Sequence, residues 1–155
     1  TFDVAQGGLV PVARNHAELM AAGQAVFAEA GTPQNAPILS AIPPSSFAGL
    51  AVTLMPWLIG GGTLSLHHGF APDTFVAQKR KQAGGAVVIP GPALSALAEA
   101  NYLDDAAKTV IALWRSPELL GPGALWRGAA SLVDVAGFGE MGLLAARRGR
   151  DGKAT

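Results

Sequence analysis

The chain contains no cysteine, few aromatic residues (6%) and no excess of either charge sign. Without cysteine, disulfide frameworks, thiol nucleophiles and thiolate metal sites are excluded, and a cytoplasmic location is the one we expect. The eleven basic and eleven acidic side chains cancel, so net charge gives no reason to expect nucleic acid as a partner. No apolar run reaches the roughly 18 residues of a membrane-spanning helix, and we expect no membrane span.

The 155 residues, half of them apolar, are enough to bury a core, and we expect a single domain over residues 1–155. The chain opens at Thr1 with no initiator Met and stops on the turn-like segment 151–155. We therefore expect an internal portion of a longer domain, although a deliberately shortened chain would look the same. A sheet cut out of a larger domain exposes apolar faces, so self-association is also expected.

Short apolar segments alternate with helical patterns along the whole chain. The predicted strands are Ile38–Ile42, Thr63–Leu66, Ala86–Ile89, Thr109–Leu113, Leu132–Val135 and Gly142–Ala146. A loop is predicted over Ala5–Pro11. Helices are predicted from the Asn15 cap to Gly31, over Phe47–Ile59 with a kink or shortening at Pro56, from Pro72 to Gly84, and from Pro92 onward. This alternation is typical of βαβ units. It predicts an α/β fold, a three-layer unit with a mostly parallel sheet and helices on both faces.

Several side chains are expected to have structural or solvent-exposed positions. Lys79, Arg80 and Lys81 should face water on their helix, and the Arg147–Arg150 run should end a surface strand. His67 and His68 are adjacent, so their rings should point to opposite sides and are not expected to share a metal. Ser46 follows a diproline without a Gly-x-Ser-x-Gly pattern, and we expect it to cap the helix that begins at Phe47.

Open parallel sheets bind ligands beyond the carboxyl ends of their strands, which directs attention to the loops there. The segment 136–142 is the most suggestive, because it carries three glycines and one carboxylate, Glu140, after a buried strand. Glycines allow the backbone to approach a ligand, and Glu140 could hold Mg²⁺ beside a phosphate. Spacing alone favours the alternative of a tight turn between two strands with Glu140 solvated.

Several segments also follow, in order, the motif series of one known superfamily. Residues 2–16 align without a gap to a phosphate loop ending Gly-x-Pro-Lys-Gly-Val-x-x-Ser-His, with Gly7, Val12 and His16 matching. Further along the chain, Pro43, Gly49 and Leu50 match the next family motif. The stretch 58–64, the helix start 70–73 and the strand end 88–92 then follow the family pattern in order. Residues 135–140 stand in place of the family's Tyr-Gly-Met-Thr-Glu, and residues 151–153 resemble its last motif. The chain resembles the adenylate-forming (AMP-binding) ligases, the acyl-CoA synthetases and their relatives.

The resemblance implies an acyl-CoA synthetase-like core that activates a small carboxylic acid with ATP and Mg²⁺, leaving AMP on the acid. Transfer to CoA or to a carrier protein would follow. It assigns Gly7, Gly137, Phe138, Gly139 and Glu140 to the nucleotide, with Glu140 as the Mg²⁺ position. A second set, Ser46, Phe47 and Gly49, would border the acyl pocket.

The departures from the family pattern favour a different hypothesis. Residues 2–6 replace nearly all the hydroxyls of the phosphate loop, Asp3 would repel phosphates, and Val10 stands where the family has lysine. Ala136 removes the aromatic ring expected beside adenine. The alternative to an active ligase is therefore a degenerate relative that keeps the fold and serves as an acyl-binding or scaffold protein.

Overall fold

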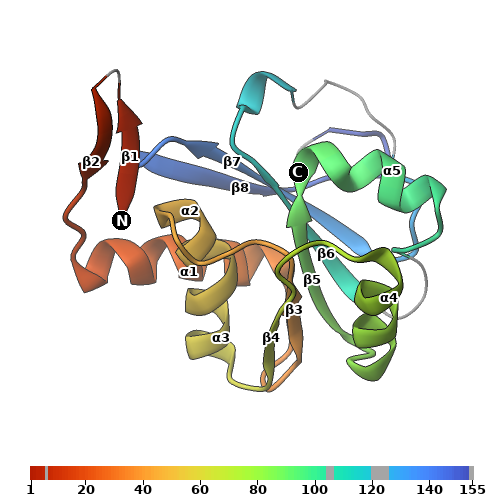
Figure 1. The fold of residues 1–155 in the computed structure, drawn as a ribbon. Helices are drawn as coiled ribbons and strands as arrows, with labels where there is room; N and C mark the ends of the chain where they lie inside the picture. The colour runs from red at the N-terminus through yellow and green to blue at the C-terminus, as the bar shows by residue number, and fades with distance from the viewer. Residues whose placement is uncertain (6, 104–106, 120–125, 154–155) are drawn as a thin grey trace.

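The computed structural model describes residues 1–5, 7–103, 107–119 and 126–153. Six strands form the main sheet in the order β4-β3-β5-β6-β7-β8 (Figure 1). All neighbours from β4 to β7 are parallel, and β8 pairs antiparallel with β7. The strands are β3 (Ile38–Ser40), β4 (Leu64–Leu66), β5 (Gly85–Pro90), β6 (Ala107–Trp114), β7 (Ser131–Phe138) and β8 (Gly142–Arg147).

Helices cover both faces of this sheet. They are α1 (His16–Ala30), α2 (Phe47–Gly49), α3 (Met55–Gly60), α4 (Pro72–Lys81) and α5 (Leu94–Glu99). On one face, Val26 of α1 and Val52 pack against Val88 and Ile111 of the sheet. On the other face, Phe75 of α4 and the leucines of α5 pack against the alternate strand residues. The predicted three-layer α/β unit with a mostly parallel sheet is therefore confirmed.

The expected helix over 47–59 forms, but it contains a π-helical turn over Leu50–Leu54 between α2 and α3. Pro56 is the physical reason we infer for the irregularity, since it has no N–H to donate to residue 52 and its ring would clash with that carbonyl. A π-helical turn widens the backbone just before the proline. The kink that the sequence predicted at Pro56 thus takes the form of a wider turn preceding it.

The segment Ala5–Pro11, predicted as a loop, is mostly a strand. Strands β1 (Phe2–Ala5) and β2 (Gly8–Pro11) form a separate antiparallel hairpin in which Ala5 pairs with Gly8. The apolar residues Leu9 and Val10 favour extended backbone, and the partner strand satisfies their backbone hydrogen-bonding groups. The prediction of an open loop was wrong because local composition did not show this pairing.

Helix α4 is anchored to the sheet by buried polar side chains as well as by Phe75. Lys79 is only 2% exposed and donates from Nζ to the carbonyl of Tyr102 at 2.8 Å, so the prediction that it faces water was wrong. His67 is also buried, with Nδ1 2.8 Å from Gln78 Oε1 and Nε2 accepting the Ala71 N–H. Lys79 extends along the apolar face of its helix to reach a carbonyl, which a charge run in the sequence does not reveal.

Arg148 also departs from its predicted surface position. Its Nε and Nη2 donate to the two carboxylate oxygens of Asp134 at 2.6 and 2.8 Å, and both side chains are nearly buried. Asp134 in addition accepts the indole N–H of Trp114 at 2.8 Å. The buried carboxylate on β7 holds the arginine inside, because an unpaired charge there would be costly.

Candidate functional site

Two segments that the sequence marked as ligand-binding meet beyond the carboxyl end of β7. Glu140 lies in the turn between β7 and β8, and its carboxylate oxygens accept the backbone N–H of Phe47 at 3.0 and 3.3 Å. Glu140 is 6% exposed. The turn between two strands is confirmed, but the expectation of a solvated Glu140 was wrong, because its carboxylate satisfies an N–H at the start of α2.

The β1–β2 hairpin brings a second carboxylate to the same turn. Gly139 has a positive φ of 56°, and a Cβ placed on it would lie 3.8 Å from an Asp3 carboxylate oxygen. Asp3 therefore lies beside the turn that carries Glu140. The turn itself is closed by the Met141 N–H, which donates to the Phe138 carbonyl.

The turn at Ser46 is tight and caps α2 as predicted. Ser46 Oγ accepts the Gly49 N–H at 3.1 Å. A Cβ on Gly49 would lie 2.4 Å from the Pro43 carbonyl oxygen, so the close approach of the two backbones requires glycine here. This turn gives Ser46 a fixed position beside the sheet edge.

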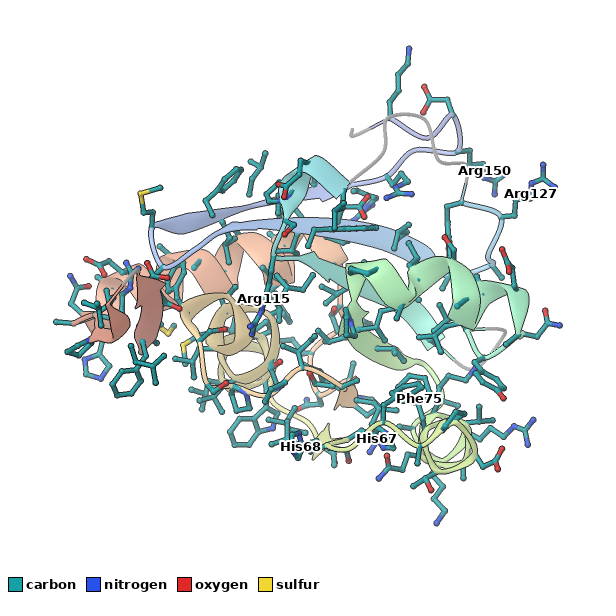
Figure 2. All side chains as sticks on the ribbon, turned by 45° about the horizontal axis from the view of Figure 1, so that its top comes forward. His67, His68, Phe75, Arg115, Arg127 and Arg150 are labelled. Carbon is teal, nitrogen blue, oxygen red and sulfur yellow. The ribbon has the colours of Figure 1, made fainter. Side chains whose placement is uncertain are left out.

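An apolar cleft of about 330 Å³ opens beyond the carboxyl ends of β3, β5 and β6. Its lining consists of small, apolar or proline residues with one serine and one arginine: Ala41, Ile42, Pro43, Pro90, Pro92, Leu113, Arg115, Ser116 and Leu119. Among these lining residues Arg115 carries the charge, and its Nη2 donates to Ser46 Oγ at 3.1 Å. Figure 2 shows Arg115 beside the helical segment that starts at α2. Ser46 is thus linked to the cleft through Arg115, while Phe47 and Gly49 do not line it.

Two arginines at this site were not singled out from the sequence. The Arg14 guanidinium lies 4.4 Å from the centroid of the Phe47 ring, and its Nε is buried without a hydrogen-bond partner among the described residues. Arg14 also pairs with Glu18 at 3.5 Å. Arg115 follows an apolar strand directly, which is a signal that could have been used, whereas nothing local distinguishes Arg14.

The remaining candidate residues are spread over the same end of the molecule. Gly137 and Phe138 end β7, and Phe138 is 46% exposed. Gly7 lies at the tip of the β1–β2 hairpin, with open space around the position of a Cβ. Gln6 lies outside the described residues. Contacts therefore join Glu140 to Phe47 and Ser46 to Arg115, while no contact among the described residues draws Gly7 to them.

The described residues of the hairpin do not fit the phosphates of a nucleotide. The Ala5–Gly8 pair leaves two residues between the strands, whereas a phosphate cradle needs several successive N–H groups facing one concavity. Residues 1–12 contain no lysine or arginine, and Asp3 is their only charged side chain. The described residues include no group of three or more possible metal ligands. With Asp3 and Glu140 as its protein ligands, Mg²⁺ would depend on ligand phosphates to complete its octahedral coordination.

The fold defines the chain as an α/β unit with a six-stranded, mostly parallel sheet. Two solved structures, the ATP-bound RpMatB-BxBclM chimeras B1 and B3, match it with TM-scores of 0.70 and 0.69 at 13% and 12% identity. Each match covers 99% of this chain and 31% of the chimera, so the chain spans about a third of their length. No family model matches the chain. No curated protein matches it either. Among the described residues, no helix is long and apolar enough to cross a membrane.

Proposed function

We propose that this chain is the carboxylic-acid-binding core of an adenylate-forming ligase-like protein and a part of a larger domain. The observation that carries the proposal is the apolar cleft with Arg115 as the charged member of its lining. A ligand that matches it has an apolar acyl or aryl group and one carboxylate. The cleft also lies beyond the carboxyl ends of parallel strands, where α/β folds bind their ligands.

The two parts of such a ligand would be held by different forces. Ile42, Leu113 and Leu119 offer apolar surface, whose burial stabilises the complex by about 25 cal/mol per Å². The Arg115 guanidinium, placed by Ser46, has further N–H donors that can pair with a carboxylate. Because Arg115 is exposed, we place its contribution near the low end of the range for charged hydrogen bonds, about 1.5 kcal/mol.

Matched acids and amides test this proposal. Hexanoic and benzoic acid are titrated calorimetrically into the chain, beside hexanamide and benzamide, which have the same apolar groups without the charge. We expect the acids to bind about tenfold more tightly than the amides, and Arg115→Gln to abolish that difference. Arg80→Gln, an exposed arginine on α4, is the matched control and should leave the difference unchanged. Equal binding of acids and amides by the original chain would contradict the proposal.

ATP-dependent activation of the acid is the second candidate function. It is favoured by the buried Arg14 Nε, which has no hydrogen-bond partner among the described residues. The Arg14 side chain lies against the Phe47 ring, and the backbone N–H of Phe47 donates to Glu140. In that function the acid displaces pyrophosphate from ATP to form an acyl-adenylate, which then passes to CoA or to a carrier thiol. The test is carboxylate-dependent exchange of labelled pyrophosphate into ATP. We expect no exchange, since the hairpin over residues 1–12 offers the phosphates neither a cradle nor a cation.

A further inference from the structure

A second cleft lies at the opposite end of β7 from the candidate site. It has a volume of about 580 Å³ and is formed where β7 begins and β8 ends. Its lining comes from two stretches of chain, residues 126–132 and 147–150. The eight residues of β7, which span about 23 Å at 3.3 Å per residue, separate this cleft from Glu140. The second cleft is therefore distinct from the candidate site.

This cleft concentrates positive charge in a chain whose net charge is zero. Its lining holds Arg127, Arg147, Arg148 and Arg150, four of the seven arginines in the sequence, and none of the described residues that line it is acidic. Asp134 compensates the charge of Arg148, and Arg147 donates to the carbonyl of Glu29. Arg127 and Arg150 add two further guanidinium charges to the lining.

Arg127 and Arg150 are the two arginines best placed to meet a ligand. Both are exposed, and Figure 2 shows them next to each other, at a distance from Arg115. Among the described residues, neither has an ion-pair or hydrogen-bond partner. Two neighbouring guanidinium groups without a carboxylate between them repel each other, and an anion that binds between them removes this repulsion.

The wall of the cleft beneath these two arginines is fixed. Arg148 is held by two hydrogen bonds to Asp134. The Trp126 indole N–H donates to the Ala130 carbonyl at 2.6 Å, and its ring lies 2.2 Å from where a Cβ on Gly128 would be. The ring can occupy that position only because residue 128 is glycine. A ligand would therefore meet a preformed concavity, and Trp126 would report on its binding.

We propose that this cleft binds a small phosphate-bearing anion with two or more negative charges. Guanidinium groups bind phosphate oxygens through two parallel N–H donors, and several of them are needed to outweigh the hydration of a multivalent anion. The volume suits a small molecule. The charge lies inside a cleft on a neutral chain rather than along an extended stripe, which favours a small anion over nucleic acid.

Calorimetric titration with inorganic pyrophosphate, without divalent metal, tests this site on the full chain. Fructose 1,6-bisphosphate and inorganic phosphate are titrated in parallel, and Trp126 fluorescence is followed with Trp126→Phe to identify its signal. We expect submillimolar binding of pyrophosphate or of the bisphosphate, and at least tenfold weaker binding of inorganic phosphate. A preference for pyrophosphate indicates an inorganic ligand, and a preference for the bisphosphate indicates a phosphate ester.

The double variant Arg127→Gln, Arg150→Gln should weaken binding of the preferred anion at least tenfold, because both side chains are exposed and their loss should not affect folding. Arg80→Gln is the control and should leave it unchanged. Three results would overturn the proposal: no binding at millimolar pyrophosphate and bisphosphate, equal affinity in the double variant, or tighter binding of a short RNA duplex than of either anion. Circular dichroism confirms that each variant is folded.

Discussion

The carboxylate of Glu140 accepts the backbone N–H of Phe47, a residue 93 positions away, at 3.0 Å. This hydrogen bond ties the β7–β8 turn to the first turn of α2, where an anionic group also interacts favourably with the helix dipole. The resemblance to adenylate-forming ligases assigns Glu140 to Mg²⁺. In this chain the same side chain also has a structural partner, the Phe47 N–H.

Replacing Glu140 with alanine should therefore destabilise the folded chain. The Phe47 N–H would lose its acceptor while buried, which costs about 1–3 kcal/mol. Glu140→Gln keeps an oxygen acceptor and should recover at least half of that loss. Urea unfolding followed by circular dichroism measures both variants, with the exposed Glu118→Ala as a control that should change stability by less than about 0.5 kcal/mol. A loss for Glu140→Ala as small as the control would show that the hydrogen bond is unimportant.

Lys79 and Lys81 should respond very differently to the same substitution. Lys79→Ala removes the donor to the Tyr102 carbonyl and empties a buried position, and we expect a loss of about 2–4 kcal/mol. Lys81→Ala, on the exposed side of α4, should stay within about 0.5 kcal/mol of the original chain. Thermal unfolding of the two variants in parallel measures the difference. Equal stability would mean that Lys79 faces water after all.

Removing one partner of the Asp134–Arg148 ion pair should destabilise the fold more than replacing both partners with apolar residues. Asp134→Ala removes the carboxylate that faces a nearly buried guanidinium and also the acceptor of the Trp114 indole, so we expect about 3–5 kcal/mol of destabilisation. Asp134→Leu combined with Arg148→Met should cost less than Asp134→Ala alone, because no buried charge remains. Chemical unfolding of the two variants compares them. A larger loss in the double variant would contradict this view of the pair.

Ile89 lies in the central strand β5 and is fully buried. Ile89→Ala should lower the free energy of unfolding by about 2–5 kcal/mol, from lost apolar burial and the cavity left behind. Calorimetric or denaturant unfolding measures the change. A loss below about 0.5 kcal/mol would be incompatible with a central strand at this position.

The fold followed from the sequence because its signals are local and repeated. Apolar runs such as Ala86–Ile89 lie within strands that extend one or two residues further, and Asn15 caps α1 through the Glu18 N–H as predicted. Val87 and Ile89, both within the predicted strand Ala86–Ile89, are buried. Helix caps and buried strands depend on a few neighbouring residues, so single segments contain most of the information.

The site was less accessible because its contacts join distant segments. The sequence placed Glu140 in the loop 136–142 and Phe47 at the start of a helix, but the hydrogen bond between them depends on the whole sheet. Lys79 and Arg148 looked like surface charges because their partners, the Tyr102 carbonyl and Asp134, are far along the chain. Which charged side chains are buried is decided by tertiary packing, and local patterns do not encode it.

The central claim is that this core binds a carboxylic acid in the cleft with Arg115 and does not bind a nucleotide at the site around Glu140. Calorimetric titration with Mg·ATP tests it most directly, carried out in the Arg127→Gln, Arg150→Gln background so that the second cleft does not contribute. We predict binding no tighter than millimolar, which corresponds to about 4 kcal/mol, with or without hexanoic acid present. Micromolar binding that disappears in Glu140→Ala would contradict the claim and establish a nucleotide site.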